Sequence, residues 1–161
     1  MAETKRIITI FLRLLALGAT VSATVAMVTS HDSAEVLNIK FMAKYNTAPS
    51  FKFYVIPEAI ASGYGLVALF LSRKSWVDGL IVIMDVLIAM LLTSSISAAL
   101  AVGEIGKKGN GHAGWLPICD QVPKFCDRVT GSLIAGFAAA IVYLVLNLYS
   151  LHVVLAPLFP V

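Results

Sequence analysis

Four long apolar stretches constrain the fold of this chain more than any other feature of its sequence. They cover residues 7–28, 54–71, 80–102 and 129–151. A helix needs roughly 20 apolar residues to cross the ~30 Å hydrocarbon core of a bilayer, and each stretch has about that length. A helix also satisfies its own backbone hydrogen bonds in lipid. The pattern therefore predicts an all-α membrane protein, a single domain of four transmembrane helices over residues 1–161.

The composition excludes an ordinary soluble domain. Hydrophobic residues make up 59% of the 161 positions and charged residues 13%, whereas soluble domains are about 45–50% apolar and about 25% charged. The formal net charge is +3, but the basic residues are scattered and form no patch or stripe of the kind that binds nucleic acid. We expect membrane lipid as a partner and no nucleic acid.

The first apolar stretch also has features of a cleaved signal peptide. Lys5 and Arg6 precede it, and residues 21–23 (Val-Ser-Ala) resemble a cleavage site. The stretch is longer than the about 7–15 apolar residues of a signal, however, and Arg13 would lie in its apolar centre. We therefore interpret it as a span that stays in the protein.

The cysteines orient the four spans. Both termini and the short turn at 72–79 belong on one side, and the loops at 29–53 and 103–128 on the other. Basic residues are more numerous in the long loops but denser in the short turn and the N-terminal tail, so charge does not decide the orientation. Cys119 and Cys126 lie in one long loop and are the only cysteines, which predicts a disulfide on an oxidising side. We therefore expect cytosolic termini and outer loops.

Opposite charges lie inside the first and third spans. Arg13 and Asp85 are each roughly 9 Å from the cytosolic boundary at the rise of an α-helix, whereas Glu58 is about 20 Å from it. A charge near the bilayer centre costs at least ~2.5–3.5 kcal/mol, so it is rarely unpaired. Arg13 alone could extend to the headgroups, but the short Asp85 side chain could not. The depths predict a structural ion pair between Arg13 and Asp85; a pair that translocates protons or ions is the alternative.

Small residues recur at four-residue spacing in all four spans. Such faces let helix backbones approach closely, which favours helix association in lipid. We expect packing inside the chain, with surface left for self-association. The predicted helix-packing residues are Gly18, Ser22, Gly63, Ser97 and Gly136.

The second long loop places Trp115 close to the two cysteines. An indole beside a cystine predicts either a compact apolar knob or an anchor at the membrane interface. His112 in the same loop is interpreted as a solvated residue. The first long loop is aromatic and basic, which suits contact with lipid or with a partner.

The sequence contains no constellation typical of catalysis. It has no phosphate-binding glycine loop after a strand, no metal-type His/Cys cluster and no nucleophile paired with a base, and its cysteines lack the Cys-x-x-Cys spacing of redox catalysts. We expect no enzyme activity, no catalytic residue, no metal and no cofactor. A membrane-embedded redox or lipid enzyme is the least favoured class.

Two segments resemble the plant CASP-like family, the relatives of the Casparian strip membrane domain proteins. They are Leu-Arg-Leu-Leu-Ala-Leu-Gly-Ala-Thr at 12–20 and Gly-Trp-Leu-Pro-Ile-Cys at 114–119. The charged pair and the outer-loop cysteines fit the same family, whose layout is also similar to that of MARVEL-domain proteins. The resemblance implies a multi-pass plasma-membrane protein that self-associates into a scaffold and recruits wall-modifying enzymes such as peroxidases. The first outer loop lacks the Asn-, Phe-, Gly- and Leu-rich motif of the strip-forming members, which argues against a role in the strip itself.

The function predicted is therefore a non-enzymatic scaffold of the plasma membrane. It would form homo- and hetero-oligomers with related four-span proteins and recruit extracellular wall-modifying partners. The alternative is a small transporter or channel subunit that uses Arg13, Asp85 and Glu58 along a polar path.

Overall fold

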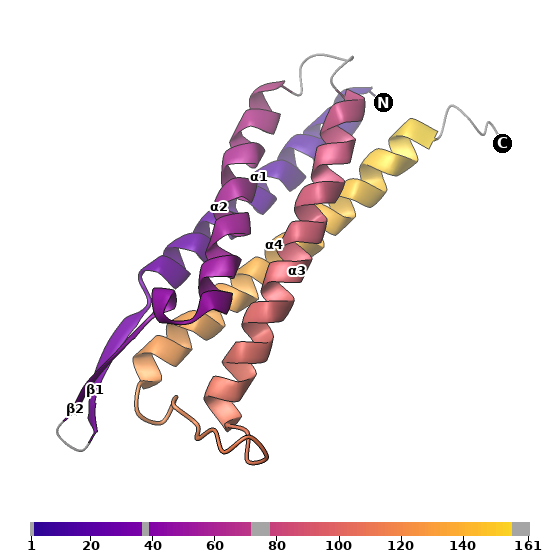
Figure 1. The fold of residues 1–161 in the computed structure, drawn as a ribbon. Helices are drawn as coiled ribbons and strands as arrows, with labels where there is room; N and C mark the ends of the chain where they lie inside the picture. The colour runs from indigo at the N-terminus through magenta and orange to yellow at the C-terminus, as the bar shows by residue number, and fades with distance from the viewer. Residues whose placement is uncertain (1, 37–38, 72–77, 156–161) are drawn as a thin grey trace.

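Four long helices form the protein in the computed structural model, which describes residues 2–36, 39–71 and 78–155 (Figure 1). The helices are α1 (Ala2–Val28), α2 (Pro49–Leu71), α3 (Asp78–Lys108) and α4 (Pro123–Leu155). All four are long and apolar enough to cross a membrane, which confirms the predicted all-α, four-span fold class. The predicted turn between the second and third spans falls mostly on residues 72–77, outside the described residues.

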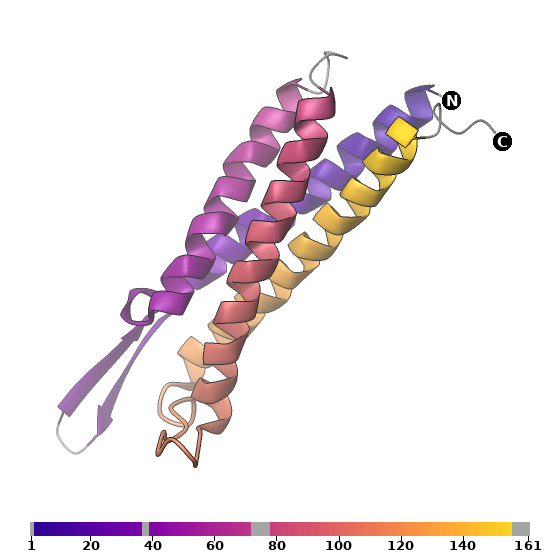
Figure 2. The same cartoon turned by 45° about the vertical axis from the view of Figure 1, so that its right-hand side comes forward.

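The helices run side by side along most of their length (Figures 1 and 2). α1 packs mainly against α2 and α4, and α3 packs mainly against the same two helices. α1 and α3 are therefore diagonal partners across the centre of the bundle. The first turn of α1 and the last turn of α4 lie at one end, and the two long connections lie at the other (Figure 1).

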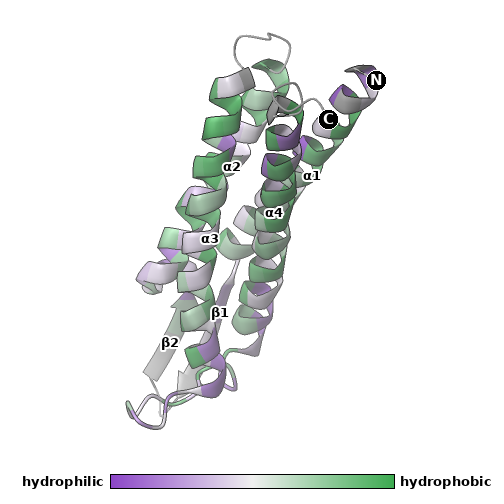
Figure 3. Ribbon diagram, turned by 90° about the vertical axis from the view of Figure 1, so that its right-hand side faces the viewer, coloured by the Kyte–Doolittle hydropathy of each residue, from purple (hydrophilic) through white to green (hydrophobic). Residues whose placement is uncertain are grey.

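The distribution of polar and apolar residues is that of a protein surrounded by lipid. Hydrophobic residues predominate along the helices (Figure 3). Many of their side chains are exposed, and Phe70, for example, is 77% exposed. Several polar side chains are instead buried in the bundle, including Arg13, Glu58 and Asp85. Since exposed apolar side chains in water would favour aggregation, this arrangement requires a bilayer around the helices.

The helices extend beyond the predicted spans. α2 begins at Pro49 and α4 at Pro123, while α3 continues to Lys108. Hydropathy marks only the part of a helix in hydrocarbon, whereas the backbone stays helical through the interface. Proline is favoured at the first helical position, which accounts for both N-terminal boundaries. Pro57 lies inside α2.

The first long connection contains a β-hairpin that the sequence did not predict. Strands β1 (His31–Val36) and β2 (Ile39–Lys44) pair antiparallel, with His31 opposite Lys44, and a short 3₁₀ helix, η1 (Tyr45–Thr47), leads into α2. The hairpin extends away from the bundle (Figure 2). An isolated two-stranded hairpin is marginally stable. Its base is held to α4 by Arg128, whose Nη1 donates to the carbonyl of Thr29 at 2.8 Å.

Candidate functional site: the buried polar layers and the outer loop

Arg13 and Asp85 meet inside the bundle. Arg13 Nη2 lies 2.7 Å from Asp85 Oδ2, and Nη1 lies 3.2 Å from Oδ1. The two side chains are only 3% and 0% exposed. This two-pronged geometry is the strongest form of an arginine–carboxylate contact. Because α1 and α3 are diagonal, the ion pair connects two helices that share little other contact.

The other two helices also bind Asp85. The hydroxyl of Tyr64 in α2 lies 2.7 Å from Asp85 Oδ1 and 3.0 Å from the carbonyl of Ile81. Asn147 Nδ2 in α4 donates to the backbone carbonyl of Asp85 at 3.2 Å. We call Arg13, Tyr64, Asp85 and Asn147 the polar cluster. It joins all four helices in one layer.

Sequence reasoning did not identify Tyr64 and Asn147. Their positions in the sequence could have suggested them. At the rise of an α-helix, both lie about as far from the cytosolic boundary of their predicted spans as Arg13 and Asp85 do. A neutral polar residue is inexpensive enough in lipid to occur without a partner, however, so depth alone would not have singled them out.

Glu58 belongs to a second buried layer, nearer the outer end of α2. Its side chain is fully buried, and neither carboxylate oxygen has a hydrogen-bond partner among the described residues. The neighbouring Tyr54 donates to the carbonyl of Ser132 at 2.7 Å, and Ser132 Oγ donates to the carbonyl of Ala23 at 2.6 Å. The predicted separation of Glu58 from Arg13 by depth agrees with this geometry.

Only one of the predicted helix-packing residues packs inside the chain. A Cβ on Gly136 would overlap the Tyr54 hydroxyl and lie 2.7 Å from Glu58 Oε1, so α2 and α4 need glycine there. At Gly18 and Gly63 no atom lies within 4 Å of a Cβ position.

Ser22 and Ser97 are exposed as well. Their hydroxyls bond to carbonyls of their own helices, at 2.7 and 2.8 Å. These two serines, Gly18 and Gly63 therefore make no close contact with another helix of the same chain, and their role in helix packing stays a prediction. Their faces point outward, because four-residue spacing defines a helix face but not what covers it.

The outer loop is closed by the predicted disulfide. Cys119 and Cys126 are bonded, with their Cα atoms 5.6 Å apart. Asn110 pairs with Trp115 in a tight turn, and Gly109 at φ +70° enters it. A Cβ on Gly109 would lie 2.6 Å from the Trp115 carbonyl, so this turn requires glycine.

Trp115 does not form the compact knob that was one expectation for this loop. Its side chain is 58% exposed and the adjacent Leu116 is 80% exposed. The other expectation, an anchor at the membrane interface, stays a prediction for Trp115. Within residues 2–36, 39–71 and 78–155, no group of three His, Cys, Asp or Glu side chains is arranged to hold a metal ion.

Comparison with known proteins agrees with these features. The family described as Casparian strip membrane protein domain matches residues 2–142. The chain is 64% identical to CASP-like protein 1C3 of Populus trichocarpa over 161 residues, which are 100% of this chain and 99% of the relative. It is 62% identical to CASP-like protein 1C1 of Vitis vinifera, covering 98% and 99% of the two chains.

A more distant relative is CASP-like protein 1C1 of Arabidopsis thaliana, which is 53% identical over 96% of this chain and 94% of its own length. No solved structure matches the chain. The region that the family model matches includes α1, α2, α3, the disulfide loop and the first part of α4. The chain therefore belongs to the CASP-like family of plant membrane proteins.

Proposed function

We propose that this chain is a non-enzymatic scaffold of the plasma membrane that assembles with copies of itself and with related four-span proteins. The observation that carries the proposal is the outward position of Gly18 and Gly63, where no atom of the chain lies within 4 Å of a Cβ position. Small residues on lipid-facing helix surfaces let a second backbone approach closely.

A scaffold also needs a surface of constant shape. The polar cluster favours this, because Arg13 and Asp85 connect the diagonal helices while Tyr64 and Asn147 connect the remaining two. Breaking a buried ion pair costs several kcal/mol, about 3–5. Sliding of one helix past another would break these contacts, so the outward faces of the bundle keep one relative arrangement.

The outer end offers a surface for extracellular partners. The hairpin and the disulfide loop both lie there (Figure 1), and Trp115 and Leu116 are exposed. Aromatic side chains are common anchors of protein interfaces. Wall-modifying enzymes are the partners that we propose for this end, on the basis of family membership.

The transporter or channel alternative has less support. Arg13 and Asp85 are nearly fully buried and bonded to each other. Among the residues that the structure describes, two large hollows of about 560 and 550 Å³ are lined by neither Arg13, Glu58 nor Asp85. A charge path needs water beside its charged groups, and a bidentate ion pair offers little to a passing ion.

Self-association can be tested with bulky replacements on the outward faces. Gly18→Leu and Gly63→Leu should each weaken chemical cross-linking of tagged copies and speed fluorescence recovery after bleaching in plant plasma membrane. Gly131→Leu is the matched control. Gly131 is also an exposed helical glycine with no atom within 4 Å of its Cβ position, but it lies at the outer end of the predicted span 129–151 and not in the middle of a span, where close approach of a second helix is expected. Recovery of the wild type at the rate of a freely diffusing four-span protein, or equal behaviour of all three variants, would contradict the proposal.

A further inference from the structure

A hollow of about 560 Å³ lies at the outer end of the bundle. The start of α2, the end of α3 and the start of α4 surround it, and the disulfide loop contributes to its wall. Its inner surface is formed by buried apolar side chains, among them Phe51, Phe125, Val129 and Leu133. The volume is within the range of about 300–1,000 Å³ typical of sites for small ligands. The hollow is separate from the polar cluster.

The hollow borders the lipid-facing surface. Leu100, Ile134 and Phe137 line it and are 45%, 67% and 55% exposed. They lie in the helices that cross the membrane, so the side chains around the opening face hydrocarbon. Apolar cavities do not hold water, and an empty one forfeits dispersion contacts along its walls. Hydrocarbon is the occupant that the surroundings supply.

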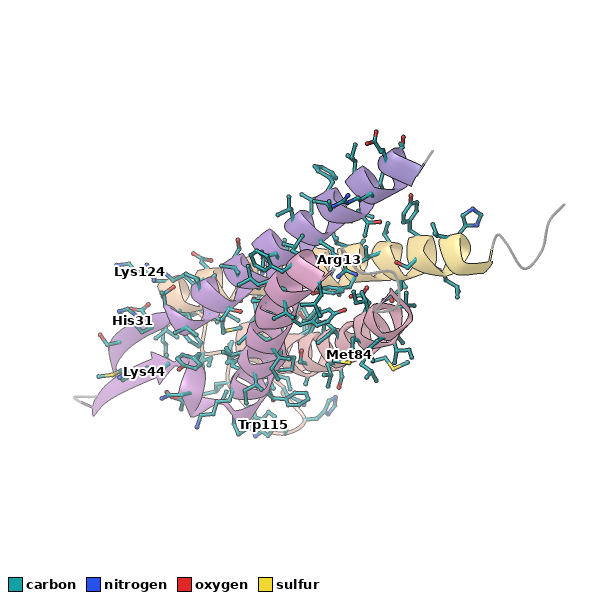
Figure 4. All side chains as sticks on the ribbon, turned by 90° about the horizontal axis from the view of Figure 1, so that it is seen from above. Arg13, His31, Lys44, Met84, Trp115 and Lys124 are labelled. Carbon is teal, nitrogen blue, oxygen red and sulfur yellow. A yellow bond between two sulfur atoms is a disulfide. The ribbon has the colours of Figure 1, made fainter. Side chains whose placement is uncertain are left out.

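The end of the hollow nearest the loops is charged. Lys44, at the end of β2, and Lys107, in the last turn of α3, both line it; Figure 4 labels Lys44 at the hairpin end, far from Arg13. Glu104 lines it too, but its Oε1 is paired with Lys108 Nζ at 2.5 Å. The balance at this end is therefore positive. An ammonium group is a common partner of phosphate.

We propose that the hollow binds one phospholipid of the outer leaflet. An acyl chain lies against Phe51, Leu133 and Phe137, and the phosphate lies between Lys44 and Lys107. The polarity along the hollow, apolar toward the bilayer centre and cationic at the boundary, is complementary to that of such a lipid. Basic pockets between transmembrane helices on the cytoplasmic side of membranes bind anionic headgroups, and the phosphate of an outer-leaflet phospholipid offers ammonium groups the same kind of contact. The bound lipid fills the space where α2 and α3 leave the outer end of the bundle unpacked.

The acyl chain can be located with a photoactivatable phosphatidylcholine that carries a diazirine near the end of one chain. The full-length protein in phosphatidylcholine nanodiscs should be labelled more heavily on α4 residues 129–137 than on α4 residues 141–148. Ile134→Trp should remove that excess, and Leu100→Trp should do the same from the opposite wall. The matched control is Ile141→Trp, since Ile141 is an exposed residue of the same helix outside the hollow, and it should keep the excess.

The headgroup is tested with a diacylglycerol that carries the same photoactivatable chain but no phosphate. Lys44→Gln and Lys107→Gln should each lower the preference for the phospholipid by about fivefold, the equivalent of one net hydrogen bond of ~1 kcal/mol to the phosphate. Lys52→Gln and Lys124→Gln, which change exposed lysines outside the hollow, should not.

Three results would overturn the proposal. The first is equal labelling of the two α4 segments in the wild type. The second is equal labelling of the wild type by the phospholipid and the diacylglycerol probes. The third is loss of cross-linked dimers in Ile134→Trp while the lipid labelling of that variant is unchanged. The last result would identify a second copy of the chain as the occupant. Retention of the disulfide and a single symmetric peak in size-exclusion chromatography show that a variant is folded before it is compared.

Discussion

The hydroxyl of Tyr64 lies 2.7 Å from Oδ1 of Asp85, on the same carboxylate that binds Arg13. Asp85 thus receives one donor from α1 and another from α2, while Asn147 of α4 binds its backbone carbonyl. A buried charge is tolerated only when it is both paired and hydrogen-bonded. Arg13 and Tyr64 meet these conditions at the carboxylate. With Asn147 at the backbone carbonyl, Asp85 is bound from each of the other three helices.

Asp85→Ala should be among the most damaging single substitutions. It leaves the guanidinium of Arg13 buried without a counter-ion, which we expect to cost about 3–5 kcal/mol. The folded yield and the thermal midpoint in detergent should both fall. Asp127→Ala is the control, because Asp127 is exposed.

The exchanged pair tests the interaction itself. Arg13→Asp combined with Asp85→Arg restores opposite charges in the same layer and should recover part of the lost yield. Recovery will be partial, because Tyr64 then faces a cation instead of the carboxylate. If the double variant is no more stable than either single change, the two side chains do not depend on each other.

Tyr64→Phe should have a smaller effect. It removes one hydrogen bond to a charged acceptor and changes almost no volume, so we expect a loss of about 1.5–3 kcal/mol. Tyr149→Phe is the control, since the Tyr149 hydroxyl makes no hydrogen bond within the part of the chain that the structure describes. A thermal midpoint unchanged by Tyr64→Phe would show that Arg13 alone satisfies Asp85.

The ion pair was predictable because its energetics leave few options. Two opposite charges at equal depth in lipid must either pair or leave the hydrocarbon, and the short aspartate side chain cannot leave. The spans were predictable for a similar reason, since lipid forces helices on long apolar segments. For Arg13 and Asp85 the cost that the bilayer imposes is large enough, and the depths are similar enough, for the sequence alone to identify the pair.

The features that the sequence did not predict contribute little free energy to folding or depend on which helix packs against them. The hairpin at His31–Val36 and Ile39–Lys44 has weak alternation of apolar residues and lies outside the hydrocarbon, so nothing forces it to appear in the pattern. The outward position of Gly18 and the inward position of Gly136 look alike in sequence, because spacing gives the face of a helix and only packing decides its neighbour.

Gly136→Ala should destabilise the bundle although alanine favours helix. The added Cβ would overlap the Tyr54 hydroxyl and crowd Glu58, and overpacking of this kind costs about 1–3 kcal/mol. Gly131→Ala on the same helix meets no atom within 4 Å and should be neutral or raise stability by up to ~1 kcal/mol. Thermal unfolding of the two variants in parallel measures the difference. Equal midpoints would mean that α2 and α4 can separate at this point without cost.

Loss of the disulfide should affect the outer loop far more than the bundle. The closed ring between Cys119 and Cys126 is short, and its closure contributes about 2–3 kcal/mol. α3 and α4 pack along their lengths on either side of it, so their association does not depend on the bond. Cys119→Ser with Cys126→Ser should speed proteolysis between residues 109 and 122 and reduce delivery to the cell surface, while the thermal midpoint of the helices changes little. Unchanged proteolysis and delivery would show that the tight turn at Gly109 and Trp115 holds the loop without the disulfide.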